Sequence, residues 1–145
     1  AEPGVTQINL STYLQLIRRS LIKAFNIALE EIVIRLESPD LLLPSAKALA
    51  IGLIASEFLA ETLRAATAQG RSGAISLTVS DLKFALELRI EDDGLGFPDN
   101  LRSIDGTDLS MEIIRTLADQ LQAELSLVAS PLSALSLRFA LEAGS

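Results

Sequence analysis

The spacing of apolar positions changes several times along the chain, and each change predicts a new element. Over residues 10–25 apolar side chains recur every three or four positions, which predicts an amphipathic helix. Longer and later runs of the same kind predict helices over about 46–68, ended by Gln69-Gly70, and about 109–121. Elsewhere the period is two, which predicts five strands, at about 31–36, 75–80, 84–90, 124–129 and 134–141.

Each predicted strand is apolar on one side only. In the third, Phe84, Leu86, Leu88 and Ile90 share one face and polar residues fill most of the other. A parallel sheet covered on both faces would instead contain continuous apolar runs. We therefore predict an α+β fold, a two-layer α/β sandwich in which three helices cover one face of a mixed five-stranded sheet. At 145 residues, the expectation is one domain over 1–145.

Composition narrows the class of protein. With 49% hydrophobic and 21% charged residues, the chain is typical of a soluble globular domain. Its most apolar stretch, 46–68, is interrupted by Glu57, Glu61 and Arg64, so no membrane span is expected. The net charge of −7 argues against nucleic acid as a partner. The start, Ala-Glu-Pro-Gly without Met or signal peptide, indicates a piece of a longer protein.

Missing residue types exclude further chemistry. The chain contains no cysteine, which excludes disulfides, thiolate metal sites and cysteine nucleophiles. It contains no histidine, so the commonest general base and metal ligand is absent as well. Any phosphoryl chemistry on histidine therefore needs a histidine outside this sequence.

Residues 90–98, Ile-Glu-Asp-Asp-Gly-Leu-Gly-Phe-Pro, are the first candidate site. Here an alternating strand runs into Gly94 and Gly96, and it brings the carboxylate of Asp92 beside backbone that a flat ligand can approach closely. That arrangement favours a site for a base or nucleotide. The alternative is an ordinary turn, because Asp-Gly is a common turn dipeptide.

Three charged residues of the long helix form the second candidate site. Glu57, Glu61 and Arg64 lie at i, i+4 and i+7 and share a face, whereas apolar residues such as Ile51 and Phe58 largely occupy other faces. The alternative is a solvated stripe with a Glu61–Arg64 pair that contributes only tenths of a kcal/mol.

Three motifs occur in the order found in one family. Residues 51–65, Ile-Gly-Leu-Ile-Ala-Ser-Glu-Phe-Leu-Ala-Glu-Thr-Leu-Arg-Ala, resemble the long-helix motif of histidine-kinase-type (GHKL, or Bergerat) ATPase domains, particularly HWE and HisKA_2 sensor kinases. Residues 92–96 resemble the first glycine box of that family, and residues 107–121 resemble the second. The resemblance covers about residues 10–141. It implies the Bergerat fold, a role in two-component signalling and a cytoplasmic location.

The resemblance also implies residue roles. Asp92 would accept a hydrogen bond from the adenine amino group, and Gly94 and Gly96 would let the base lie against the backbone. Glu57 matches the acid that activates the attacking nucleophile. Arg64 matches the lysine of the long-helix motif and, with Asp108 and Ser110 of the second glycine box, would lie in the nucleotide site. ATP and Mg²⁺ are the implied cofactors. The implied partners are a histidine-bearing dimerisation segment and a response regulator, with a homodimer in the full-length protein.

Several positions depart from the family pattern. Glu61 stands where the family has the asparagine that holds Mg²⁺, so the nucleotide's metal would meet a longer, fully charged ligand. Asp108 and Ser110 replace two glycines whose N–H groups approach the phosphates. In addition, Gln122-Ala123 replaces a Gly-Gly pair and Ser133-Ala134 replaces a Gly-Thr pair. We therefore predict weak or absent ATP binding.

Three hypotheses follow. The first is the catalytic domain of a two-component sensor histidine kinase with a decayed nucleotide site, transferring phosphate to a histidine elsewhere. The second is a non-catalytic docking or regulatory module, or a histidine-phosphotransferase-like module, with the same fold. Glu61, Asp108 and Ser110 discriminate between them and favour the second. The third, an unrelated small α/β domain, is disfavoured by the order of the motifs.

Overall fold

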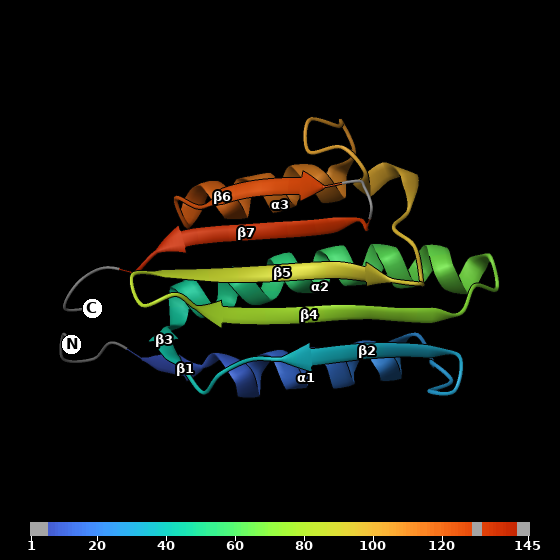
Figure 1. The fold of residues 1–145 in the computed structure, drawn as a ribbon, viewed down its shortest axis with the longest axis horizontal. Coiled ribbons are helices and arrows are strands. Elements are labelled where there is room, and N and C mark those ends of the chain that lie inside the picture. Colours follow the sequence, from blue (N-terminus) through green and yellow to red (C-terminus); the bar gives the residue numbers. More distant parts are fainter. Residues whose placement is uncertain (1–5, 129–131, 142–145) are drawn as a thin grey trace.

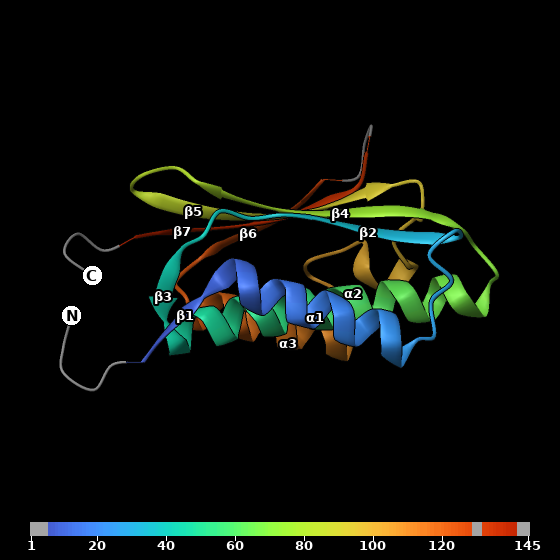
Figure 2. The same ribbon diagram turned by 90° about the horizontal axis from the view of Figure 1, so that it is seen from below.

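The computed structural model describes residues 6–128 and 132–141, which form two layers (Figures 1 and 2). One layer holds helices α1 (Leu10–Ala24), α2 (Ser45–Ala68) and α3 (Leu109–Gln120). The other is a sheet with the order β2 (Ile32–Glu37), β4 (Gly73–Asp81), β5 (Ala85–Asp93), β7 (Ala134–Ala140) and β6 (Glu124–Val128). Strands β2 and β4 are parallel and the other pairs antiparallel. The predicted sandwich, with three helices on one face of a mixed five-stranded sheet, is confirmed.

Three short elements were not predicted. Strands β1 (Gln7–Asn9) and β3 (Leu42–Pro44) pair antiparallel outside the main sheet, and a 3-10 helix, η1, spans Asp99–Leu101. Strands of three residues are too short for alternation to reveal them. Strand β1 leads directly into α1, where the Asn9 side chain caps the helix by accepting a hydrogen bond from the Thr12 amide at 3.1 Å. Residue 129, predicted to end the fourth strand, lies outside the described residues.

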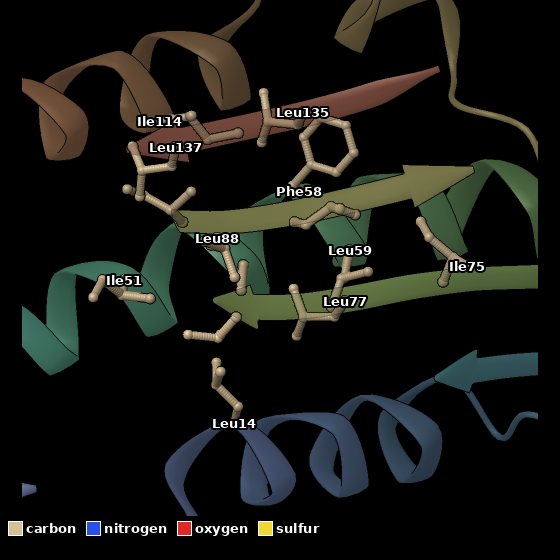
Figure 3. Packing of buried hydrophobic residues seen from close by; sticks show 14 of the residues in the cluster. Leu14, Ile51, Phe58, Leu59, Ile75, Leu77, Leu88, Ile114, Leu135 and Leu137 are labelled. Carbon is tan, nitrogen blue, oxygen red and sulfur yellow. The ribbon is translucent and has the colours of Figure 1, made fainter. Parts of the chain in front are cut away.

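The hydrophobic core fills the space between the layers (Figure 3). Alternate strand positions such as Leu77, Leu88 and Leu137 point towards the helices and are almost fully buried. Helix α2 lies in the middle of its layer and supplies Ile51 and Phe58, both without exposed surface. It is the most buried helix, as expected. No helix in the described part of the chain is long and apolar enough to cross a membrane.

The prediction for Phe84 is wrong. Alternation placed its ring on the buried face with Leu86, but the side chain is 79% exposed. The β4–β5 hairpin explains the difference: Leu82 donates its amide to the Ala85 carbonyl at 2.8 Å, and Lys83 has a φ of 74°. Phe84 therefore belongs to the turn, and the alternation that fixes the buried face begins only at Ala85.

The outer face of the sheet carries polar and charged side chains. Arg89 donates to Glu91 at 3.1 Å and to Ser136 at 3.3 Å, and Arg35 forms an ion pair with Asp93. These groups are partly or largely exposed, so each pair contributes only about 0–1 kcal/mol. The prediction of one helix-covered and one solvent-facing surface is thus confirmed.

Candidate functional site

Asp92 and the two glycines that follow form a closed turn at the end of β5. The Asp92 Oδ1 atom accepts hydrogen bonds from the amides of Gly94, at 3.0 Å, and Gly96, at 2.8 Å. Gly94 and Gly96 have φ values of 111° and 88°, which side-chain-bearing residues rarely adopt. Both bonds use the same oxygen, so Oδ2 of Asp92 is left for an external donor.

The glycine turn rests on the start of β4. A Cβ added to Gly73 would lie 2.6 Å from the carbonyl carbon of Gly94, so only glycine allows this approach. Leu95 donates its amide to the Ala74 carbonyl at 3.2 Å, and Phe97 is buried against α2. The rings of Phe97 and Phe58 meet edge to face, with centroids 4.7 Å apart. Backbone and aromatic packing therefore fix the turn relative to α2.

The two glutamates of α2 contact segments that are distant in sequence. Ser110 donates its hydroxyl to Glu57 Oε1 at 2.8 Å, across 53 residues. Asn100 donates its amide to Glu61 Oε2 at 3.1 Å, across 39 residues, and Glu61 also pairs with Arg64. The predicted shared face and the predicted ion pair are both present. The carboxylates are more than a solvated stripe, because each is tied to the loop or helix that follows the glycine turn.

Asp108 is the N-cap of α3. Its Oδ2 accepts a hydrogen bond from the Ser110 amide at 3.0 Å, and its extended backbone is typical of a cap. The Ser110 side chain is buried and reaches Glu57. The preceding loop is held by Arg115, which donates to the carbonyls of Ile104 and Gly106. Side chains of this protein therefore already engage the start of α3.

The predicted site residues thus form three neighbouring groups. The glycine turn of Asp92 lies at the end of β5, Glu61 and Arg64 lie on α2 near Asn100, and Glu57 lies beside the start of α3. One loop, residues 94–108, connects them. Within residues 6–128 and 132–141, no three acidic side chains are grouped so that they could hold a metal ion.

Two residues of this region were missed by the sequence analysis. Asn100 contacts Glu61, and Arg71 lies across the glycine turn, with its Nη1 atom 2.6 Å from where a Cβ on Gly96 would be. Neither residue belongs to a recognisable motif. Their positions depend on how the loop folds back onto α2, which no local spacing indicates.

This architecture was compared with known proteins by sequence and by structure. No family model and no curated protein matches the sequence. Among solved structures, the histidine kinase domain of the Erythrobacter litoralis EL346 blue-light activated histidine kinase superposes with a TM-score of 0.80 at 25% identity, covering 96% of this chain and 69% of that one. This chain has the fold of a GHKL-like histidine kinase ATPase domain. A longer structure of that kinase gives a TM-score of 0.76 at 26% identity over 91% of this chain.

This chain spans only 45% of that longer kinase structure. The catalytic domain of the histidine kinase ThkA matches over 94% of this chain and 95% of its own, with a TM-score of 0.66 and 15% identity, which is similarity of fold alone. The resemblance predicted from the motifs and the Bergerat fold are therefore confirmed. The roles assigned to individual site residues stay predictions.

Proposed function

We propose that this ATPase domain is the ATP-binding-type domain of a two-component sensor histidine kinase, with a nucleotide site that holds Mg·ATP weakly. One observation carries the proposal: the start of α3 is closed by this chain's own side chains. Asp108 accepts a hydrogen bond from the Ser110 amide, and the Ser110 hydroxyl donates one to Glu57. In the family that resembles this sequence, the corresponding backbone approaches the phosphates.

The base end of the site suits an adenine. Asp92 is held by two backbone amides, so its position is fixed before a ligand arrives. Its second oxygen can accept a hydrogen bond from an exocyclic amino group, and the bare backbone of Gly94 and Gly96 permits close approach. We infer from this geometry and from the resemblance that Asp92 recognises the base.

The phosphate end does not suit a magnesium triphosphate. Glu61, at the position of the family's metal-binding asparagine, already accepts from Asn100 and pairs with Arg64. The Asp108 carboxylate accepts the hydrogen bond of the Ser110 amide, which is then not available to a phosphate oxygen. Each carboxylate also repels phosphate charge, which at 4 Å and an effective dielectric of 20 amounts to about 4 kcal/mol per pair of unit charges. Phosphoryl transfer at this site is therefore expected to be poor.

Partners follow from the same proposal. The sequence contains no histidine, so a phosphoacceptor would lie on a dimerisation segment outside it. A response regulator would then receive the phosphoryl group, and the full-length protein would be a cytoplasmic homodimer. In this scheme Glu57, which accepts a hydrogen bond from Ser110, is the candidate for activating the nucleophile.

A docking or regulatory module with the same fold is the second candidate. The hydrogen bonds that Glu57, Glu61 and Asp108 accept within the domain favour this candidate, because these carboxylates have partners without any ligand. The two candidates differ at the base end. A kinase domain with a decayed phosphate site keeps measurable affinity for adenosine, whereas a pure docking module has lost it.

We expect adenosine to shift the amide signals of Gly94 and Gly96 in a ¹⁵N NMR titration, with Asp92→Asn weakening binding about tenfold through loss of a charge-assisted hydrogen bond. Asp93→Asn is the matched control, because Asp93 is the next residue but pairs with Arg35 on the outer face. Equal effects of the two variants would contradict base recognition by Asp92. No response to adenosine at all would favour the docking module.

A further inference from the structure

Arg71 lies in the connection between α2 and β4, where its amide donates to the Ala66 carbonyl at 2.9 Å. From there the guanidinium reaches over the glycine turn. Its Nη1 atom occupies space beside Gly96 that any side chain at that position would fill. The absence of a side chain at Gly96 therefore makes room for this arginine.

One nitrogen of the Arg71 guanidinium lacks an acceptor. Its Nε atom is buried and has no hydrogen-bond partner among the described residues. Arginine carries donors only, and a buried N–H without an acceptor is unfavourable. An oxyanion in the cleft that Arg71 lines would offer acceptors to its guanidinium group.

A cleft of about 480 Å³ opens in front of Arg71. Its lining includes a second arginine, Arg102, and the amide side chains of Gln69 and Asn100. Arg102 is fixed by its Nε, which donates to the Phe97 carbonyl at 3.1 Å, while 56% of its side chain is exposed.

The lining also includes one carboxylate, that of Asp99. It is 99% exposed and lies 3.8 Å from the Arg102 Nε, so it reduces but does not cancel the positive charge. In a chain with a net charge of −7, a cleft with two guanidinium groups and one carboxylate is a local excess of cations.

We propose that this cleft is an anion site, in which Arg71 and Arg102 bind the phosphate or carboxylate group of a small molecule. Guanidinium groups match both oxyanions through paired N–H donors. The site lies beside Gly96 and includes Asn100, which donates to Glu61. It adjoins the candidate nucleotide site, but binding of an oxyanion there needs neither a base nor a metal ion.

The test is an NMR titration of the ¹⁵N-labelled chain with inorganic phosphate, and separately with acetate, at constant ionic strength and without nucleotide or Mg²⁺. We expect saturable shifts at Gly96, Arg71 and Arg102, with a dissociation constant on the order of millimolar. Arg71→Gln should weaken binding about tenfold and Arg102→Gln severalfold. The stronger of the two ions identifies the phosphate or the carboxylate as the preferred group.

Arg89→Gln is the control, because it removes the same charge from the outer face of the sheet, where Arg89 pairs with Glu91. It should leave the affinity within about twofold if long-range charge effects are screened. Should Arg71→Gln fail to fold, Arg102→Gln still tests the cleft, since that side chain is more than half exposed. Shifts that rise linearly without saturation, or that respond equally to all three variants, would overturn the proposal.

Discussion

Phe58→Ala is expected to lower the free energy of unfolding by about 3–5 kcal/mol, the range for truncating a buried phenylalanine. The side chain has no exposed surface and lies between α2 and the sheet (Figure 3). It also meets Phe97 edge to face, so the substitution removes the aromatic contact that holds the glycine turn against α2. Urea unfolding followed by circular dichroism measures the loss.

Phe84→Ala is the matched control for this substitution. It deletes the same atoms from a ring that is 79% exposed on the β4–β5 turn. We expect a change within about 0.5 kcal/mol, as for other surface substitutions. Similar losses for the two variants would mean that the packing of Phe58 described above is wrong. If Phe58→Ala does not fold, Phe58→Leu should still cost more than Phe84→Leu.

Glu61→Asn combined with Asp108→Gly and Ser110→Gly is expected to tighten Mg·ATP binding by at least about tenfold, or 1.4 kcal/mol. The three changes remove two carboxylates from the phosphate end, free the first amides of α3 and release Glu57 from Ser110. Adenosine affinity should change much less, because the base end is untouched. Calorimetric titration of both ligands gives the two changes.

The triple change also has a structural cost. Replacing the Asp108 cap by glycine costs only a few tenths of a kcal/mol, but glycine at position 110 costs about 0.5–1 kcal/mol in the first turn of α3. Folding is therefore checked by circular dichroism. Glu87→Gln with Glu124→Gln is the charge control, since both lie opposite Arg138 on the outer sheet face. If this control tightens ATP equally, net charge and not the site explains the gain.

The fold was predictable because the helices and the strands each impose a regular spacing of apolar residues on the sequence. Alternation in β4, β5 and β7 identified the buried face, and three- and four-residue spacing identified α1 and α3. Where the backbone leaves a helix or strand, the spacing of apolar residues no longer indicates which side chains are buried. Phe84 was misplaced because a turn with a positive φ at Lys83 interrupts the alternation. Strands β1 and β3 were missed because three residues are too few to show a period.

The site was predictable only as far as its motifs reach. Asp92 and its glycines are contiguous, and Glu57, Glu61 and Arg64 share one helix face, so local reasoning found both groups. Contacts between segments were not predictable: nothing near Glu61 indicates that Asn100, 39 residues later, will donate to it. Arg71 is a similar case, since its environment depends on the approach of the β5 turn to the α2–β4 connection.

The most direct test of a histidine-kinase-type domain with a poor phosphate site is calorimetric titration of Mg·ATP into the unmodified chain. We predict a dissociation constant on the order of a millimolar or weaker, with ADP or adenosine binding no worse than ATP. Glu61 and Asp108 are the reason, because both place negative charge where the phosphates would lie. A low-micromolar dissociation constant for Mg·ATP would contradict this prediction and show that the site accepts the triphosphate as it stands.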